Sequence, residues 1–411
     1  MKNEPIKTID LFAGCGGLLD GFEQEGHYET MAAVEWEPTA CETLKRRLCD
    51  KWKYKNASDI AICFDLQRSN ELFSGWKDDL SYGTGVGLDA LLNGRSVDLV
   101  IGGPPCQAYS LAGRIRDANG MRDDYRNFLF ESYARVISHY KPKAFVFENV
   151  PGLLSAKPKD RYISELITEK FNQLGYAIAS DLKQTLINMA DYGVPQNRKR
   201  LIILGLSKDI YGDKTEQLLE TFYTKILPAM MVKKTVTVAQ AIGDLPKLYP
   251  LGKTVRIGGR KLSHSEPETA VANHHPRFHN DRDISIFRML AKDIESGVYK
   301  YTSTESLKAL YTEMTGHISS VHKYHVLRAN EPSNLIPAHL FKDGLRHIHP
   351  DSEQARSITV REAARLQGFP DDFIFYGSVG EQYKMIGNAV PPIFSKILAT
   401  GIRKLLFMKT F

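Results

Sequence analysis

Up to about residue 210, the chain alternates short apolar runs with amphipathic stretches. This alternation is typical of βαβ units, in which helices join the strands of a parallel sheet. The first four apolar runs each end at or next to a glycine or a polar residue. Because ligands of open α/β sheets bind at the carboxyl ends of the strands, we expect these residues to line one crevice. Five runs are predicted to be buried strands: 8–14 (TIDLFAG), 30–35 (TMAAVE), 97–103 (VDLVIGG), 143–150 (KAFVFENV) and 200–206 (RLIILGL).

The pattern changes after residue 210. Apolar periodicity weakens, basic residues gather, and ten of the twelve histidines lie between His264 and His349. One helix is predicted over 283–297, with Ile284, Phe287, Leu290 and Ile294 on one face and Gly297 at its end. We therefore expect a second domain over 211–377, which separates residues 1–210 from residues 378–411.

Strong local signals return near the end of the chain. In TVREAARLQGFP (359–370), Thr359 and Glu362 form a capping box before a short helix that Gly368 ends. In YKMIGNAVPPIFSKILATGI (383–402), we expect a glycine–asparagine turn and then a helix opened by two prolines, Pro391 and Pro392.

Composition narrows the class of protein. Hydrophobic residues make up 43% and charged residues 25%, no apolar stretch is long enough to span a membrane, and the first residues contain no apolar signal segment. We expect a cytoplasmic protein. The five cysteines show no CxxC spacing, which argues against a disulfide framework and against a cysteine zinc site. The net charge of +6 permits a polyanionic partner without requiring one.

A glycine-rich loop follows the first predicted strand in DLFAGCGGL (10–18). Its GxGG spacing matches neither the dinucleotide fingerprint nor the Walker loop. Glu35 ends the second strand, where a carboxylate can accept both ribose hydroxyls, and Trp36 can stack on an adenine. These features favour an adenosyl ligand without a pyrophosphate; a tight turn next to a surface glutamate is the alternative. GTGVGL (83–88) lacks this context and is predicted to be a plain loop.

A single cysteine, Cys106, stands on a stiff turn in IGGPPCQAYS (101–110). Two prolines fix the backbone immediately before it. Taken alone, the thiol could serve packing, metal binding or nucleophilic attack.

Five motifs identify a resemblance. DLFAGCGG, GGPPCQ, FENV, YGVPQNRKR and IGNAVPP occur in this order. Together they resemble the DNA (cytosine-5) methyltransferases that use S-adenosylmethionine, typically those of bacterial restriction–modification systems. The resemblance runs from residue 8 to about residue 402. It implies a doubly wound, Rossmann-like α/β methyltransferase sheet with a smaller inserted target-recognition domain. It further implies double-stranded DNA as partner, a monomer, and a cognate restriction endonuclease encoded nearby without a stable complex.

The resemblance also implies a set of cofactor contacts. Asp65 and Leu66, in CFDLQ, match the pair whose aspartate holds the adenine amino group, although SDI at 58–60 competes for this place. The residues that match S-adenosylmethionine contacts are Phe12, Gly14, Cys15, Gly16, Gly17, Glu35, Trp36, Asp65, Leu66, Pro105, Leu129, Asn388 and Val390.

The chemistry of cytosine methylation assigns roles to the other motifs. C5 becomes nucleophilic when a thiolate adds to C6, and Cys106 is the residue suited to this addition. Glu148 is the acid expected at N3, and Arg200 can offer its fork to O2, with Arg198 in support and Asn149 fixing the turn. The alternative is that Glu148 and Arg200 form only a salt bridge. No residue is identified as the base that removes the C5 proton; water can act there.

Two segments are expected to contact DNA. Residues 107–127 fit a mobile lid over a flipped-out base, and a solvated loop is the alternative. Base-reading residues are expected within 250–350, where a merely solvated basic surface is the competing interpretation; a histidine metal site lacks a partner motif. The candidates are Ser110, Arg114, Arg116 and Arg122 in the lid and Arg256, Arg260, His274, His275, Arg277 and His279 in the second segment.

Two other functions stay open. One is an RNA cytosine methyltransferase of the transfer-RNA type on the same fold, against which the long basic insertion favours duplex DNA. The other is a catalytically silent DNA-binding relative, against which the intact set of Cys106, Glu148 and Arg200 argues.

Overall fold

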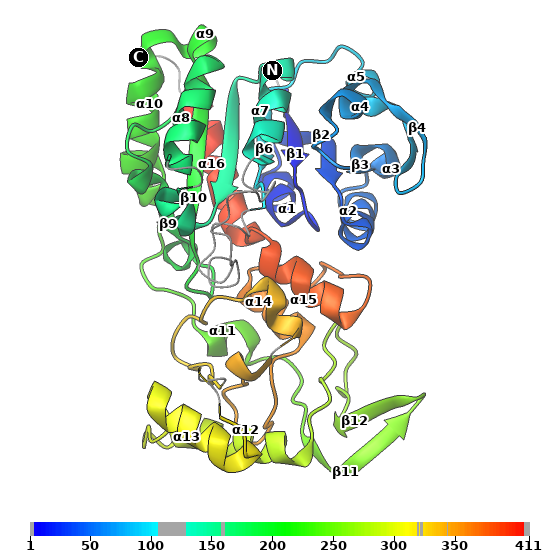
Figure 1. Cartoon of the computed structure of the whole chain (residues 1–411), viewed down its shortest axis with the longest axis vertical. Coiled ribbons are helices and arrows are strands. Elements are labelled where there is room, and N and C mark those ends of the chain that lie inside the picture. Colours follow the sequence, from blue (N-terminus) through cyan, green and yellow to red (C-terminus); the bar gives the residue numbers. More distant parts are fainter. Residues whose placement is uncertain are drawn as a thin grey trace. The chain divides into compact units, whose positions relative to one another are not determined.

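The computed structural model describes residues 4–105, 129–157, 161–318, 320, 324–342 and 344–406 (Figure 1). The chain forms two compact units. The sheet unit consists of Met1–Gly193, Arg198–Lys233 and Ala389–Phe411, and the insert unit consists of Val194–Asn197 and Lys234–Asn388.

These limits differ from the expected second domain, 211–377, at both of its ends. Residues 211–233 pack on the sheet instead, where the Tyr223 hydroxyl donates to the Ile202 carbonyl oxygen (2.8 Å) and accepts the Leu204 N–H (2.8 Å).

A mixed sheet with the order β3-β2-β1-β6-β7-β10-β8 forms the centre of the sheet unit, and β9 pairs with β10. The four neighbouring strand pairs from β3 to β7 are parallel, whereas β10 is antiparallel to β7, β8 and β9. The strands are β1 (Ile6–Leu11), β2 (Tyr28–Glu35), β3 (Ala61–Cys63), β6 (Leu99–Gly102), β7 (Ala144–Asn149), β8 (Tyr176–Ala177), β9 (Leu186–Asn188) and β10 (Lys199–Ser207).

All five predicted strands are therefore confirmed, but a wholly parallel sheet is wrong at β10. Because β7 and β8 are both antiparallel to β10, they run in the same direction, with β10 between them. The fifth apolar run, β10, thus lies between two strands that run opposite to it. Apolar periodicity predicts a buried strand but carries no information on its direction.

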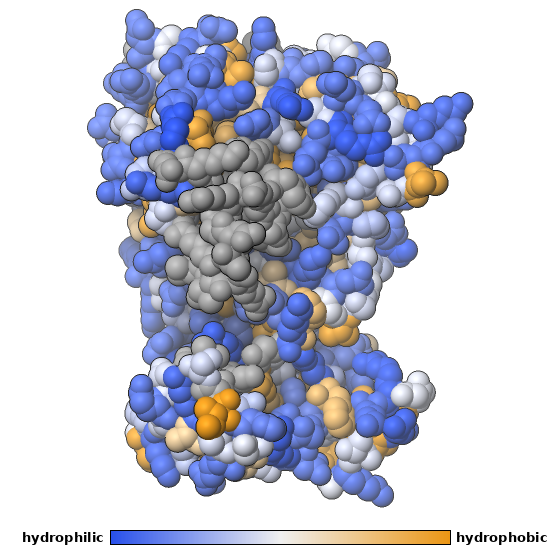
Figure 2. Space-filling view, viewed as in Figure 1, coloured by the Kyte–Doolittle hydropathy of each residue, from blue (hydrophilic) through white to orange (hydrophobic). Residues whose placement is uncertain are grey.

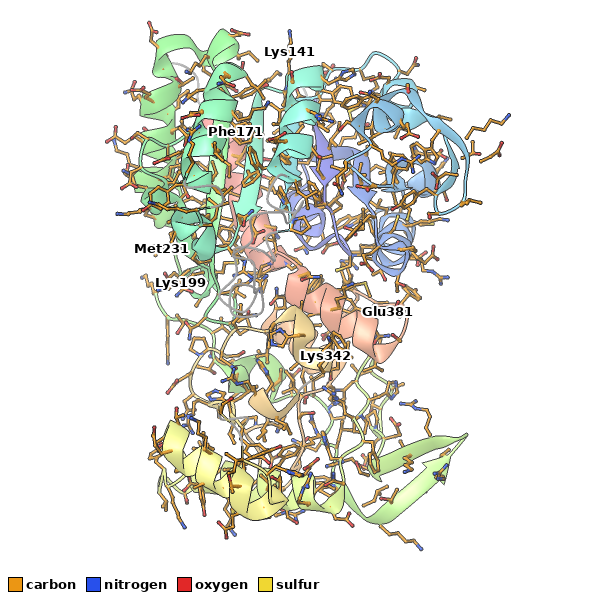
Figure 3. All side chains as sticks on the ribbon, viewed as in Figure 1. Lys141, Phe171, Lys199, Met231, Lys342 and Glu381 are labelled. Atoms are coloured by element: carbon orange, nitrogen blue, oxygen red, sulfur yellow. The ribbon has the colours of Figure 1, made fainter. Side chains whose placement is uncertain are left out.

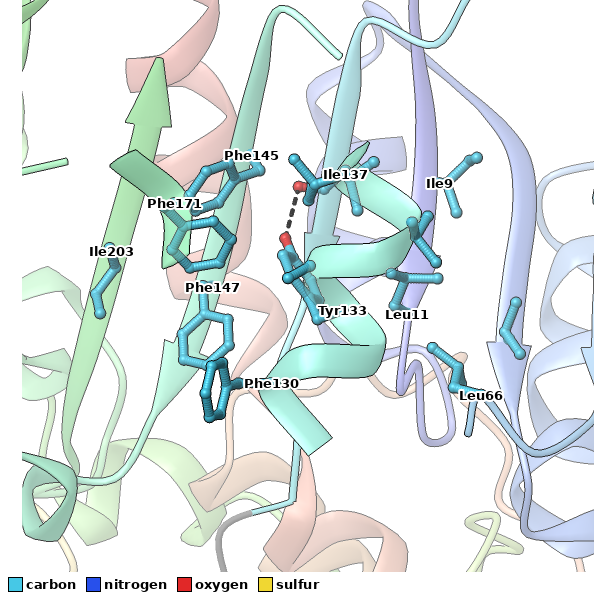
Figure 4. Packing of buried hydrophobic residues seen from close by; sticks show 14 of the residues in the cluster. Ile9, Leu11, Leu66, Phe130, Tyr133, Ile137, Phe145, Phe147, Phe171 and Ile203 are labelled. Atoms are coloured by element: carbon cyan, nitrogen blue, oxygen red, sulfur yellow. Dashed lines mark hydrogen bonds between the residues drawn. The ribbon is translucent and has the colours of Figure 1, made fainter. Parts of the chain in front are cut away.

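Helices cover the sheet. On one face, the buried Tyr133 lies among Phe145, Phe147 and Phe171, and its hydroxyl donates to the carbonyl oxygens of Val100 (3.0 Å) and Val146 (2.8 Å) (Figure 4). The helices of this unit are α1 (Gly17–Glu25), α2 (Pro38–Asp50), α3 (Ala57–Ile60), α4 (Ser69–Ser74), α5 (Gly87–Leu92), α7 (Leu129–Tyr140), α8 (Ile163–Gln173), α9 (Lys208–Tyr211), α10 (Thr215–Thr221) and α16 (Pro392–Leu406).

The end of the chain returns to its beginning, because α16 packs against α1. A Cβ atom on Gly21 would lie 2.3 Å from the Ser395 Cβ, so the glycine permits this close approach. The Tyr28 hydroxyl donates to the Ala399 carbonyl oxygen (2.6 Å). Both contacts tie α16, which begins at Pro392 as predicted, to the first βα unit.

The plain loop predicted at 83–88 is wrong. Strands β4 (Trp76–Asp79) and β5 (Gly83–Gly85) form a hairpin there, and α5 begins at Gly87. A Cβ atom on Gly85 would come within 2.3 Å of the Trp76 ring. The glycines therefore allow close packing, which a glycine-rich composition alone does not reveal.

The insert unit holds fewer regular elements. The predicted helix at 283–297 is confirmed as α12, but it begins two residues earlier because the Asn280 side chain caps it by accepting the Asp283 N–H (2.8 Å). The capping box of Thr359 and Glu362 is also confirmed. The elements are α11 (Val238–Ile242), β11 (Pro250–Ile257), β12 (Arg260–His264), α12 (Asp281–Glu295), α13 (Thr304–Thr315), α14 (Val360–Leu366) and α15 (Val379–Asn388).

The glycine–asparagine turn predicted near 387 is wrong, since Gly387 and Asn388 are the last residues of α15. A Cβ atom on Gly387 would lie 2.4 Å from the Ala338 nitrogen and from the Pro337 carbonyl carbon. This glycine therefore serves a close approach of α15 to another segment of the insert unit rather than a turn.

Hydrophilic side chains cover most of the face of the molecule drawn in Figure 2, and apolar ones are scattered in small groups. Within the described part of the chain, no helix combines the length and the apolar character that crossing a membrane requires.

Candidate active site

The glycine loop after β1 has a backbone that few residues other than glycine adopt. Phe12, Gly14 and Gly16 have positive φ angles of 57°, 58° and 92°, and α1 begins at Gly17. A Cβ atom on Gly14 would meet no other atom within 4 Å, so space lies open beside the loop. Cys15 is buried, and burial raises the pKa of its thiol, which favours a neutral packing role for the side chain.

Glu35 lies at the carboxyl end of β2 and is buried, so the alternative of a surface glutamate does not hold. Its Oε2 accepts the Gly14 N–H (2.8 Å), and its Oε1 accepts the Glu37 N–H (2.9 Å). Burial raises the pKa of Glu35, and these backbone donors oppose the shift. Next to it, 43% of Trp36 is exposed.

Asp65 and Leu66 lie just beyond the carboxyl end of β3, the strand beside β2. Cys63 pairs in register with Glu35, and the Phe64 N–H donates to the Glu35 carbonyl oxygen (3.0 Å). The competing segment, 58–60, belongs to helix α3, before the strand begins. Of these two candidates for the contact to the adenine amino group, the geometry favours Asp65, because it lies at the same end of the sheet as Glu35 and residues 58–60 do not.

Glu148, near the carboxyl end of β7, is held from two sides. The Arg200 Nε lies 3.0 Å from its Oε1, and both side chains are largely buried. A Cβ atom on Gly103 would come within 2.6 Å of its Oε2, so the carboxylate lies directly against the GGPP turn. The structure thus brings Glu148, Arg200 and that turn together.

Asn149 fixes the same turn, as expected. Its Nδ2 donates to the Pro104 carbonyl oxygen (3.3 Å), and its Oδ1 accepts the Val150 N–H (2.8 Å). Pro105 is the last described residue before the gap. Cys106 follows it in the sequence and, with Ser110, Arg114, Arg116 and Arg122 and the whole expected lid at 107–127, lies outside the described residues.

Arg198 occupies a buried position close to these charges. Burial lowers the pKa of its guanidinium, the charge of Arg200 lowers it further, and Glu148 opposes the shift. A buried arginine that is influenced by both charges is consistent with the supporting role expected for it.

The remaining cofactor candidates lie on several elements. Leu129 is the first residue of α7 and is buried. Asn388 is the last residue of α15 in the insert unit. Val390, in the sheet unit, is buried.

Burial separates the DNA-reading candidates into two groups. Arg256, Arg260 and His275 are exposed, and the His275 Nδ1 lies 2.7 Å from the Glu266 Oε2. His274 is buried, with Nδ1 at 2.9 Å from the Thr359 Oγ1 and Nε2 at 2.9 Å from the Pro246 carbonyl oxygen.

His279 and Arg277 are also engaged within the insert unit. Burial lowers the pKa of His279 to about 3, and its Nε2 accepts the Ser357 N–H (3.3 Å). Arg277 donates to the carbonyl oxygens of Leu340 (3.1 Å) and Phe341 (2.9 Å). These contacts argue against base recognition by His274, Arg277 and His279, because each side chain is already hydrogen-bonded within the insert unit.

Sequence reasoning missed one carboxyl group near the glycine loop. Asp10, in β1, is buried, and neither of its carboxylate oxygens has a hydrogen-bond partner among the described residues. Burial raises the pKa of Asp10, and the nearby Glu35 raises it further. A lone acid inside an apolar strand was the available signal. No cluster of three or more metal-ligating side chains occurs in the described part of the chain.

Comparisons with known proteins agree with this geometry. The sequence model of the family described as "C-5 cytosine-specific DNA methylase" matches residues 6–404. Type II methyltransferase M.Bpa9945I from Bacillus paralicheniformis is 35% identical over 97% of this chain and 99% of that protein. Type II methyltransferase M.XorII from Xanthomonas oryzae pv. oryzae is 32% identical over 98% of this chain and 85% of that protein.

Solved structures share the fold. A protein encoded within an E. coli prophage has a TM-score of 0.59 and 23% identity, covering 98% of this chain and 99% of that one. The Dnmt2 methyltransferase of S. pombe has a TM-score of 0.51 and 16% identity, covering 98% and 100%. From the family match over nearly its whole length and from these relatives, the chain belongs to the C-5 cytosine-specific DNA methylases.

Proposed function

We propose that this protein transfers a methyl group from S-adenosylmethionine to C5 of a flipped-out cytosine within a specific duplex DNA sequence. We further propose that it is the modification enzyme of a type II restriction–modification system, as the names of its relatives suggest. The single observation that carries the reaction is the position of the Glu148 carboxylate, between Arg200 and the turn that leads into Cys106.

The residues at the carboxyl ends of β1 to β3 fit an adenosyl group. Each Glu35 oxygen accepts one backbone N–H, which leaves lone pairs for the ribose hydroxyls. The exposed Trp36 ring offers a face for the adenine, Asp65 can accept from its amino group, and the open space at Gly14 leaves room beside the loop. When bound, S-adenosylmethionine supplies an electrophilic methyl group.

Cys106 is the proposed nucleophile. The bonds of Asn149 to the Pro104 carbonyl and to the Val150 N–H restrain the backbone that precedes it, and proline further restricts the turn. The thiolate adds to C6 of the cytosine, and the electron pair of the C5–C6 double bond then becomes available at C5. A positioned nucleophile lowers the entropic part of the barrier.

Glu148 and Arg200 stabilise the charge that this addition moves onto the base. In its protonated form Glu148 donates a proton to N3 as the negative charge develops there and takes it back when the ring is restored, and Arg200 donates hydrogen bonds to O2. Their mutual contact at 3.0 Å keeps both groups oriented before the base enters. After methyl transfer, water takes the C5 proton, and β-elimination restores the aromatic ring and releases the Cys106 thiolate.

The test is covalent trapping. The methylated cytosine is first mapped by bisulfite sequencing of unmethylated DNA treated with the full-length protein and S-adenosylmethionine. A duplex with 5-fluorocytosine at that position is then expected to trap the protein covalently, since fluorine cannot leave as a proton does. Cys106→Ala is expected to trap none. An adduct that persists in Cys106→Ala, or labelled methyl transfer to transfer RNA in place of DNA, would contradict the proposal.

A further inference from the structure

An exposed two-stranded ribbon stands out from the insert unit. Strands β11 (Pro250–Ile257) and β12 (Arg260–His264) are antiparallel, and Gly258 and Gly259 join them with positive φ angles of 54° and 80°. Two central residues with positive φ form the tight turn whose twist suits a hairpin. The ribbon projects beyond the other elements of its unit in Figure 1, and its side chains stand clear of them in Figure 3.

The base of the ribbon is fixed to the insert unit. Leu262 is buried, the Ser263 Oγ accepts the His279 N–H (2.9 Å), and the His264 Nε2 lies 2.9 Å from the Gln354 carbonyl oxygen. Toward the tip, Arg256, Ile257, Arg260 and Lys261 are exposed. The ribbon is thus held at one end and open at the other.

The charges of the ribbon do not neutralise one another, although the Lys261 Nζ lies 5.7 Å from the centre of the Phe278 ring. Residues 250–264 contain Lys253, Arg256, Arg260 and Lys261 and no acidic residue. Arg256 lies directly opposite Lys261, and like charges in opposite positions destabilise a strand pair. At the tip, Ile257 is 63% exposed opposite Arg260. A polyanion that binds along the ribbon would remove this repulsion.

The register assigns the side chains to two faces. Arg256 and Lys261 share one face because they are a directly opposite pair, and Val255 and Leu262 share the other. Leu262 is buried near the base, so there the face of Arg256 and Lys261 is the one available to a partner; Arg260, on the face of Val255, is exposed at the tip.

We infer that the β11–β12 ribbon enters the major groove of the DNA, with Arg256 reading the O6 and N7 edge of a guanine and Lys253 and Arg260 contacting phosphates. The major groove admits a two-stranded ribbon, and arginine recognises guanine through a bidentate pair. This inference rests on the proposed function, which supplies the duplex. The alternative is that the basic side chains only protect the exposed edges of the ribbon from pairing with other strands.

The test combines three variants with one altered base. The full-length protein and its variants Arg256→Lys, Arg256→Ala and, as matched control, Arg288→Ala on the exposed face of α12 methylate the same DNA library, and bisulfite sequencing gives each target sequence. Rates are also measured on the same DNA made with 7-deazaguanine, which removes only the N7 acceptor. Circular dichroism checks that each variant is folded.

We expect Arg256→Lys, which keeps the charge but loses the fork, to relax the preference for one guanine. The wild type is expected to methylate 7-deazaguanine DNA at least about tenfold more slowly than ordinary DNA. Arg256→Ala, which has already lost the contact to N7, should methylate both DNAs at the same rate. Arg288→Ala keeps the wild-type target and rate. Unchanged targets and rates in both Arg256 variants would overturn the role of the ribbon while leaving the proposed function intact. A wild type that transfers no methyl group to DNA would overturn both.

Discussion

The Glu148 carboxylate is positioned by the absence of a side chain. Its Oε2 would lie only 2.6 Å from a Cβ atom on Gly103, closer than real Cβ contacts allow, while its Oε1 lies 3.0 Å from the Arg200 Nε. The φ angle of Gly103 lies outside the left-handed region, so space rather than backbone conformation requires glycine here. The second glycine of GGPP is therefore needed to leave room for the Glu148 carboxylate.

We expect Gly103→Ala to lower the rate of methyl transfer on the order of 10- to 100-fold, because the added methyl group must displace the acid by a fraction of an ångström to an ångström. Gly380→Ala is the matched control, since its nearest neighbour would be an ordinary 3.6 Å away on Phe341. Single-turnover transfer of labelled methyl groups measures the rate, and thermal unfolding checks the fold. A Gly103→Ala rate equal to that of Gly380→Ala would show that the carboxylate is not held by this contact.

At the scale of one element, helix α14 depends on a buried ion pair. Glu362 caps the helix and also accepts from Arg356 at both oxygens, Oε1 at 2.6 Å and Oε2 at 2.7 Å. Burial alone would raise the pKa of Glu362, but the charge and hydrogen bonds of Arg356 hold it well below its usual range. The sequence showed the capping box but not the arginine that neutralises it.

We expect Arg356→Met to lower the free energy of unfolding by about 3–5 kcal/mol, because it leaves the Glu362 charge buried without its partner. The double variant Arg356→Met, Glu362→Gln should regain part of this loss. Asp371→Ala breaks the more exposed pair with Arg365 (2.7 Å) and should cost less than about 1 kcal/mol. Urea unfolding measures all three, and equal losses for Arg356→Met and Asp371→Ala would contradict this account.

The insert unit, which contains α14, is expected to lose stability in acid. Burial lowers the pKa of His264 and His349 to about 4 and of His347 to about 3, below the ordinary 6.5. Between the folded and unfolded values the unfolded state binds more protons, so stability is fully present above about pH 6.5 and falls as the pH decreases toward 4. Each such histidine costs on the order of 1–2 kcal/mol at pH 5.

Urea unfolding of His349→Gln from pH 7 to pH 5 tests this expectation. Its free energy of unfolding should fall less steeply with decreasing pH than that of the wild type, whereas His275→Gln, at an exposed site, should follow the wild type. Parallel curves for all three proteins would exclude His349 as a source of the acid sensitivity.

Local signals in the sequence predicted these elements best. The capping box at Thr359 and the apolar face of α12 depend on neighbours within a few residues, and both are confirmed. The direction of β10, the helical place of Gly387 and the burial of His274 depend on partners far away in the sequence. Periodicity and composition do not encode such partners. The sequence therefore predicts a turn at Gly387 and a DNA contact at His274, whereas the structure places the first in a helix and buries the second.

For the whole molecule, we expect DNA binding to depend more on where the basic residues lie than on the net charge. The chain carries 54 basic and 48 acidic residues, a net charge of +6, and residues 250–264 supply four basic and no acidic residues. This segment thus contributes +4, against a total that is only modestly basic. Attraction to DNA is then expected to depend on the ribbon rather than on the overall charge.

The salt dependence of DNA binding tests that distribution. Each phosphate contact that is lost should reduce the slope of log K against log salt by about 0.9, because fewer counterions are released. Lys253→Ala with Arg260→Ala is therefore expected to reduce the slope by about 1.8. Arg288→Ala with Lys292→Ala removes the same charge from the exposed face of α12 and should leave the slope unchanged. Fluorescence anisotropy with a labelled duplex measures both. If the two double variants reduce the slope equally, net charge governs binding and the ribbon has no special place in it, because only a localised contact can distinguish two variants of identical charge.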